Sequence, residues 1–168
     1  MAFINICGPV EANTVYADKE LVAKDTSVTL PEVAPMTADI EAMGTMSIPM
    51  WNRLEDMETS ITKIGIDKGL GKMIKAEKVA IEVRFVQKVT LADGTIKDVG
   101  CKAFLTLLPK VIPGIELAVG EVSENEVTST TLRYQLYADG EEMWCIDRLA
   151  GICRIGGKDY GAAIQKYL

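Results

Sequence analysis

The stretch "TADIEAMGTMSIPM", residues 37–50, alternates between two kinds of side chain along nearly its whole length. This two-residue period is typical of a half-buried β-strand. Its polar face holds acids and hydroxyls and no basic residue. One face carries Ala38, Ile40, Ala42, Gly44, Met46, Ile48 and Met50, and the other carries Thr37, Asp39, Glu41, Thr45 and Ser47.

The length of this stretch leaves two interpretations open. As one strand it would extend about 46 Å at roughly 3.3 Å per residue, whereas a compact chain of 168 residues is only about 40 Å across. It is therefore either a strand that spans its own domain or two shorter strands broken near Gly44, since glycine is common at bulges. Residues 57–66 alternate again, which favours one long hairpin with Trp51–Asp56 at its tip.

The rest of the chain indicates a mainly β protein with antiparallel hairpins. Strands are expected over residues 27–33, 78–90 and 96–109. The last two are expected to form a hairpin, because the turn between them contains Asp93-Gly94, a strong hairpin signal. A loop is expected over 111–126. Residues 127–149 form a further hairpin that turns at Ala138–Glu141.

Two short helices and one uncertain segment complete the organisation. Asp67 is suited to be the N-cap of a helix within residues 67–78, where Leu70, Met73 and Ile74 make an apolar stripe. The C-terminus "GAAIQKYL" is expected to be briefly helical. Residues 1–26 show weak periodicity with an early turn at Gly8–Pro9. We expect a single domain over residues 1–168 with one principal helix.

Composition and charge exclude several classes of function. A net charge of −6 and a pI near 4.8 argue against sequence-independent binding of nucleic acid, because such binding needs a basic surface. The chain has no histidine, so it holds neither a Ser-His-Asp triad nor a histidine metal site. Its four scattered cysteines are expected to be free, buried thiols. We expect no metal, cofactor or secretory signal.

Two motifs that suggest chemistry have simpler explanations. "GIDKGLGKM" lacks the spacing and the hydroxyl of a phosphate loop. The adjacent acids Glu55/Asp56 and Glu141/Glu142 lie at expected turns, where carboxylates are normally solvated, and neither pair has the geometry that glycoside hydrolysis requires. The sequence therefore contains no catalytic constellation, and we expect no enzyme activity.

Residues 27–168 nevertheless resemble a known family. "TLRYQLYADGEEMWCIDRLAGICRIGGKDYGAAIQKYL" resembles the end of the major tail tube proteins of contractile-tailed bacteriophages and of the related R-type bacteriocins. "SVTLPEV" is similar to an early strand of that family, and "EAMGTMSIPMWNRLEDMETSITKIGI" is similar to its long hairpin. Residues 1–26 match the usual opening poorly.

This resemblance implies a β-sandwich or barrel-like protomer that forms hexameric rings. Stacked rings would make a tube with a β-barrel inner wall, inside a contractile sheath, with the tape measure protein and the baseplate hub as further partners. DNA would be passing cargo in a phage, and the target membrane would be met only by the whole particle. The resemblance also implies synthesis in the bacterial cytoplasm and assembly into a virion tail or a released bacteriocin particle. The lumen would be lined by Asp39, Glu41, Thr45, Ser47, Glu58, Ser60 and Thr62, and the tip that contacts another subunit would comprise Trp51, Arg53, Leu54, Glu55 and Asp56.

A second interpretation stays open. The chain could be a non-enzymatic adaptor or ligand-binding β-domain that works as a monomer or dimer. The sequence also leaves open whether the particle would be a phage or a headless bacteriocin.

Overall fold

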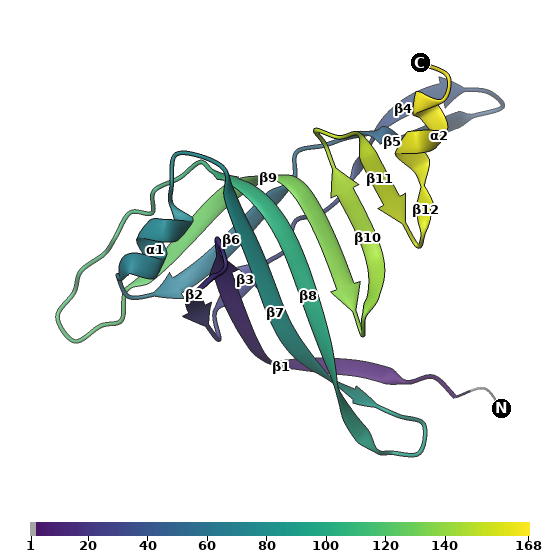
Figure 1. The fold of residues 1–168 in the computed structure, drawn as a ribbon. Helices are drawn as coiled ribbons and strands as arrows, with labels where there is room; N and C mark the ends of the chain where they lie inside the picture. Colours follow the sequence, from purple (N-terminus) through teal and green to yellow (C-terminus); the bar gives the residue numbers. More distant parts are fainter. Residues whose placement is uncertain (1–2) are drawn as a thin grey trace.

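The computed structural model describes residues 3–168 and is built mainly of antiparallel strands (Figure 1). A 10-stranded sheet runs in the order β12-β11-β10-β9-β8-β7-β1-β2, and β6 joins it by pairing with both β9 and β3. The mainly β prediction is confirmed. The strands are β1 (Ile6–Ala17), β2 (Glu20–Lys24), β3 (Ser27–Thr29), β4 (Pro35–Glu41), β5 (Thr45–Leu54), β6 (Glu58–Ile64), β7 (Val79–Thr90), β8 (Ile96–Pro109), β9 (Glu124–Ala138), β10 (Glu141–Asp147), β11 (Ile152–Ile155) and β12 (Lys158–Asp159), and the helices are α1 (Lys68–Met73) and α2 (Tyr160–Gln165).

The large sheet folds over itself around the largest hydrophobic cluster because β9 belongs to two layers. Its first half pairs with β6, and its second half pairs with β8 and β10. Inward side chains of β6 and β9, such as Ile61 and Val127, pack in the same cluster as Val83 and Leu105 of β7 and β8. Since both layers bury their inner faces against this core, their outer faces point in opposite directions.

Local signals in the sequence explain α1 and the β7–β8 hairpin. Asp67 caps α1 by accepting the backbone N–H of Leu70 at 3.0 Å, and Leu70 and Met73 are buried beneath the helix. At the β7–β8 turn, the Asp93 carboxylate accepts the backbone N–H of Thr95 at 2.9 Å. The predicted helix is confirmed in a shorter form, and both predicted strands are confirmed.

The alternating stretch at residues 37–50 forms two strands rather than one. The chain reverses at residues 42–44, where Met43 and Gly44 have φ angles of 55° and 121°, and β4 pairs with β5 from Met36–Met50 to Glu41–Thr45. The break near Gly44 is therefore correct, although it is a hairpin turn and not a bulge. The predicted long hairpin is wrong, because residues 58–64 pair with β9 and β3 instead of β5.

The N-terminal segment also differs from its prediction. Instead of turning at Gly8–Pro9, the chain forms the long strand β1, which pairs with β7 and β2. Its register shifts between Cys7 and Val10 and again between Val10 and Ala12, and such irregularities accommodate a proline that has no N–H to donate. Residues 1 and 2 of the predicted segment lie outside the described residues.

The predicted β9–β10 hairpin and C-terminal helix are both present. Asp159 caps α2 by accepting the N–H groups of Gly161 and Ala162 at 2.9 Å and 3.1 Å. A Cβ atom at Gly161 would collide with the carbonyl oxygen of Gly151, so α2 packs closely on the β10–β11 loop. All four cysteines are free, as expected, but Cys7 is exposed because it lies near the start of β1, away from the core.

Candidate functional site

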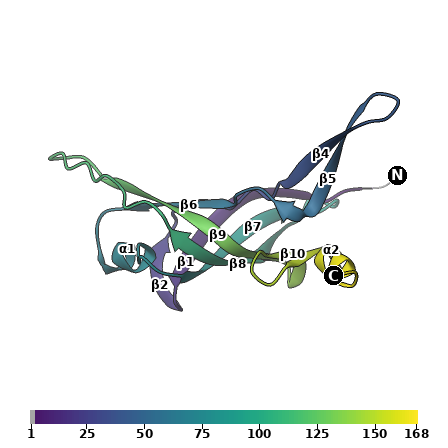
Figure 2. The same cartoon turned by 90° about the horizontal axis from the view of Figure 1, so that it is seen from above.

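The β4–β5 hairpin projects from the body of the protein as a separate two-stranded sheet (Figures 1 and 2). Its cross-strand pairs place most of the apolar side chains on one face, which comprises Met36, Ala38, Ile40, Met46, Ile48 and Met50. The side chains of Met36, Ile40, Met46 and Ile48 are between 40% and 51% exposed. Because an isolated two-stranded hairpin is marginally stable in water, this uncovered apolar face is a candidate docking surface.

The opposite face of the hairpin brings together four of the predicted lumen residues. Asp39 lies opposite Ser47, whose hydroxyl donates a hydrogen bond to the Asp39 carboxylate, and Glu41 lies opposite Thr45. This face contains no basic side chain. The sequence alternation therefore assigned the two faces of the hairpin correctly.

The other three predicted lumen residues lie on a different sheet. Glu58, Ser60 and Thr62 share the outer face of β6, next to Glu126, Thr128 and Thr130 of β9 and Ser27 and Thr29 of β3. The Ser60 hydroxyl donates to Glu126 at 2.7 Å. Lys110 donates to Glu58 at 2.6 Å, and this contact raises the pKa of Lys110. We call this surface the hydroxyl face.

A second outer face, which the prediction did not assign to a site, covers the opposite layer. Its charged residues include Glu82 and Arg84 of β7, Lys102 of β8, which lies opposite Arg84, and Arg133 of β9, which lies opposite Thr106. Arg84 bonds to Glu82 at 2.6 Å and lies over the ring of Tyr16 at 4.6 Å. We call this surface the mixed-charge face. The alternation of residues 79–90 was its signal in the sequence.

The residues predicted to form an exposed tip lie instead at the base of the β4–β5 hairpin. Trp51, Arg53 and Leu54 belong to the end of β5, and Glu55 and Asp56 follow it. The tip prediction is therefore wrong in its geometry, because the chain reverses at Gly44 and continues in one direction through residues 51–54. Contact of these residues with another subunit stays a prediction.

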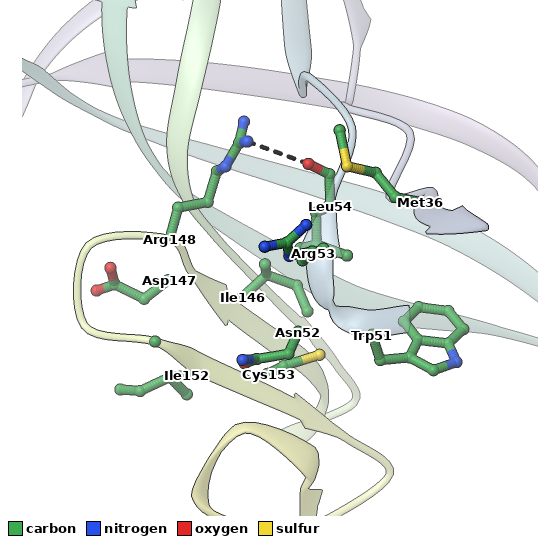
Figure 3. A pocket seen from close by; sticks show the side chains of 11 residues that line it. Met36, Trp51, Asn52, Arg53, Leu54, Ile146, Asp147, Arg148, Ile152 and Cys153 are labelled. Carbon is green, nitrogen blue, oxygen red and sulfur yellow. Dashed lines mark hydrogen bonds between the residues drawn. The ribbon is translucent and has the colours of Figure 1, made fainter. Parts of the chain in front are cut away.

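A pocket of about 340 Å³ opens beside this base, between β5 and the β10–β11 hairpin (Figure 3). Arg148 donates to the carbonyl oxygen of Leu54 at 3.2 Å, and its guanidinium lies 3.7 Å from Asp56. We call this pocket the basal groove; its lining includes Met36, Trp51, Arg53, Leu54, Arg148 and Ile152.

Comparisons with known proteins identify the family. Residues 10–168 match the family described as phage tail tube protein FII. The chain belongs to this family.

Solved structures show the same fold. The chain is similar to a protein of the sheath-tube complex of PVC, an extracellular contractile injection system in its extended state, with a TM-score of 0.52 and 16% identity over 77% of this chain and 90% of that one. It is also similar to a protein of the sheath/tube terminator of that system, with a TM-score of 0.54 and 15% identity over 77% of this chain and 95% of that one. A comparison with curated protein sequences gives no match.

Membership of a tail tube family makes this chain a structural tube protein rather than an enzyme. The functional residues of a tube protein are then those on the surfaces that contact other molecules. Among residues 3–168, no group of three or more histidine, cysteine, aspartate or glutamate residues is arranged to hold a metal ion. No helix in that range is long and apolar enough to cross a membrane.

One acidic pair that was expected to be solvated is partly structural. Glu142 accepts hydrogen bonds from Arg154 at 2.6 Å and from Gln135 at 2.9 Å. The Arg154 contact, followed by those with Gln135 and Tyr137, lowers the pKa of the Glu142 carboxyl. Its neighbour Glu141 is exposed. The expectation is therefore wrong for Glu142, because the β10–β11 pairing brings a distant arginine to it.

Proposed function

We propose that this chain forms hexameric rings that stack into the inner tube of a contractile phage tail or R-type bacteriocin. A sheath encloses the tube, and sheath contraction drives the tube through the target cell envelope. Membership of the tail tube family supports the tube, and the similarity to proteins from sheath-tube assemblies supports the sheath. The tube then conducts DNA or ions, with the tape measure protein and baseplate hub as further partners.

The uncovered apolar face of the β4–β5 hairpin is the observation that carries this proposal. Its side chains gain little by contact with their own chain, since the hairpin extends away from the body (Figure 2). Burial of apolar surface contributes about 25 cal/mol per Å². In a particle made of many copies, each copy has a neighbouring copy that can cover this face.

Covering the apolar face would leave the polar face of the hairpin free. In the proposed tube, Asp39, Glu41, Thr45 and Ser47 line the lumen together with the hydroxyl face, which carries Glu58, Ser60 and Thr62. Six copies of a chain with a net charge of −6 make an acidic assembly. An acidic, hydroxyl-rich wall repels a polyanion and lets it slide past rather than bind.

The two-layer fold then indicates what the remaining outer surface would contact. If the hydroxyl face is turned to the lumen, the mixed-charge face, which points the opposite way, is turned to the sheath. It carries the cations Arg84, Lys102 and Arg133 together with the acid Glu82, so contacts there would be ion pairs that weaken as salt screens them over about 10 Å.

A pair of matched variants on one strand tests the proposal. Met46→Gln with Ile48→Gln changes the apolar face of β5, whereas Thr45→Gln with Ser47→Gln changes its polar face. We expect the wild-type protein and the second variant to form tubes in negative-stain microscopy, and the first to remain folded by circular dichroism but dispersed in sedimentation. Tubes from the apolar-face variant would contradict the role of the hairpin.

The same experiment separates the alternative function. An adaptor or ligand-binding domain would give a discrete monomer or dimer at every concentration, with no rings or filaments. Rings that assemble as concentration rises support the tube. The presence or absence of a DNA-filled head on particles from the host then distinguishes a phage from a bacteriocin.

A further inference from the structure

The link between β8 and β9 is an exposed apolar loop at one end of the protein. It carries Val111, Ile112, Ile115, Leu117, Val119 and Val122, whose side chains are between 41% and 107% exposed. The only charged residues over positions 111–123 are Glu116 and Glu121. We call residues 111–123 the apolar loop.

Both ends of this loop are fixed to the sheet. The backbone N–H of Lys110 donates to the carbonyl oxygen of Thr128 at 3.2 Å, and the N–H of Gly65 donates to that of Ser123 at 2.9 Å. The side-chain amide of Asn125 donates a hydrogen bond to the carbonyl oxygen of Gly65 at 2.9 Å. The loop is therefore presented from a firm base, with its apolar residues directed to solvent.

The basal groove lies toward the opposite end of the molecule. Both views place the β8–β9 loop at one extreme and the β4–β5 hairpin, β11 and α2 toward the other (Figures 1 and 2). The loop of one chain therefore cannot reach its own groove. A contact between them joins two copies head to tail, and such a heterologous contact is repeated from copy to copy.

The two surfaces are complementary in chemistry. Trp51, Leu54 and Ile152 give the groove an apolar lining, and the guanidinium groups of Arg53 and Arg148 lie at it (Figure 3). The one acid among its lining residues, Asp147, accepts the N–H groups of Leu149 and Ala150, both at 3.0 Å. The loop is apolar and acidic, and the groove is apolar and presents two guanidinium groups, of which that of Arg148 also lies 3.7 Å from Asp56.

We propose that the apolar loop of each copy seats in the basal groove of a copy in the adjacent ring, with Glu116 and Glu121 facing Arg53 and Arg148. This contact sets the polarity of stacking, because each ring presents loops on one side and grooves on the other. The inference rests on the proposed function, since it supposes that rings of this chain stack.

Charge reversal tests the contact in both directions. Glu116→Lys with Glu121→Lys, and separately Arg53→Glu with Arg148→Glu, should each reduce tube length at least tenfold and leave short stacks or single rings. All four changes in one chain should restore long tubes. A matched control, Asp98→Lys with Glu141→Lys, makes the same change in net charge as the glutamate variant, at the ends of β8 and β10 that lie opposite to the loop and the groove, and should leave tube length unchanged.

A cross-link provides a second measurement that does not depend on charge. Leu117→Cys and Ile152→Cys in one chain, with Cys7→Ser, should give a ladder of covalent multimers after mild oxidation of assembled tubes. A variant with only one of the two introduced cysteines should give none, because the remaining native thiols of Cys101, Cys145 and Cys153 are buried. Because loop and groove lie at opposite ends, a bond within one chain is excluded and the ladder reports contact between copies.

The outcomes distinguish this inference from the proposed function. Wild-type protein that forms neither rings nor tubes overturns the proposed function itself. Long tubes from either charge-reversal variant, or tubes that yield no ladder from the chain with both introduced cysteines, overturn the loop-to-groove contact while the tube function stands.

Discussion

The ammonium group of Lys63 lies 2.8 Å from the carboxylate of Asp67, four residues further along the chain. The Lys63 side chain is only 7% exposed, whereas that of Asp67 is 59% exposed. Lys63 also donates to the carbonyl oxygen of Val22, and Asp67 caps α1 through Leu70. One ion pair therefore joins β6, β2 and the start of α1, and the Lys63 hydrogen bond is the main cause of the lowered pKa of Asp67.

Removing Asp67 should destabilise the protein more than its exposure suggests. Asp67→Ala leaves a nearly buried ammonium without its counter-charge and removes the cap, which together should lower the free energy of unfolding by about 2 kcal/mol. Asp67→Asn keeps a capping oxygen and should lose about half as much. Urea unfolding in the dispersed Met46→Gln, Ile48→Gln background measures both.

The adjacent exposed residue provides the control for this prediction. Lys68→Ala should change the free energy of unfolding by less than about 0.5 kcal/mol, as is usual for surface substitutions. Equal losses for Lys68→Ala and Asp67→Ala would show that the ion pair and cap contribute nothing specific.

A buried hydroxyl pair gives a second prediction about stability. The Thr59 and Thr131 side-chain oxygens are 2.6 Å apart, and both residues are fully buried where β6 pairs with β9. Thr59→Val leaves the Thr131 hydroxyl without this partner and should cost about 1–3 kcal/mol. Replacing both by valine removes the unpaired group and should recover most of that loss. A double variant that is as unstable as the sum of the two singles would contradict this coupling.

The Glu142–Arg154 contact should make stability depend on pH in a defined direction. The pKa of Glu142 is lowered in the folded protein from an ordinary value of 4.5. Its contribution is therefore fully present above about pH 4.5 and is lost as pH falls through the lower, folded-state value. Glu142→Gln should be less stable than the wild type by about 1 kcal/mol at pH 7, and the difference should shrink in more acidic solution.

The neighbouring acid is the matched control for the pH measurement. Glu141→Gln removes an exposed carboxylate that is adjacent in sequence. The thermal unfolding of this variant should follow that of the wild type at pH 7 and at pH 3. A constant difference between Glu142→Gln and the wild type from pH 7 down to pH 3 would rule out an electrostatic origin.

The strands that sequence reasoning located well are those with a local turn signal. Asp93-Gly94 fixed the β7–β8 hairpin, and Asp139-Gly140 fixed the β9–β10 hairpin, because these turn residues tolerate the required backbone angles. In contrast, β1 was missed since Pro9 and two register shifts disrupt its alternation. Periodicity detects a strand only where its pairing is regular.

The alternation of polar and apolar residues did not determine which strands pair with one another. Residues 57–66 were expected to pair with residues 37–50, yet β6 pairs with β9, where Thr59 and Thr131 make their buried contact. A threonine on the inner face gives no sign in the sequence that it is buried. The basal groove was missed for a related reason, because it joins β5 to β10 and β11, which are distant in the chain.

Charge in the proposed lumen gives the final prediction. Asp39 and Glu41 lie on the polar face of the β4–β5 hairpin, away from the apolar face proposed to pack against another copy. Asp39→Lys with Glu41→Lys should therefore permit assembly, although it removes the Ser47 hydrogen bond. The change replaces acidic groups with cations that attract a polyanion. Tubes of a phage should then release DNA more slowly, and tubes of a bacteriocin should change which ions they pass.

The measurement is a reconstruction of the assembled tube together with a release or conductance assay. Thr37→Lys with Thr45→Lys is a control that adds cations to the same face while keeping both acids, and it should have a smaller effect on passage. Asp39, Glu41 and Glu58 on the outer wall of the map would contradict the proposal. In that arrangement, reversal of their charge would impair sheath attachment and leave passage unchanged, because the groups that meet the cargo would be those of the mixed-charge face.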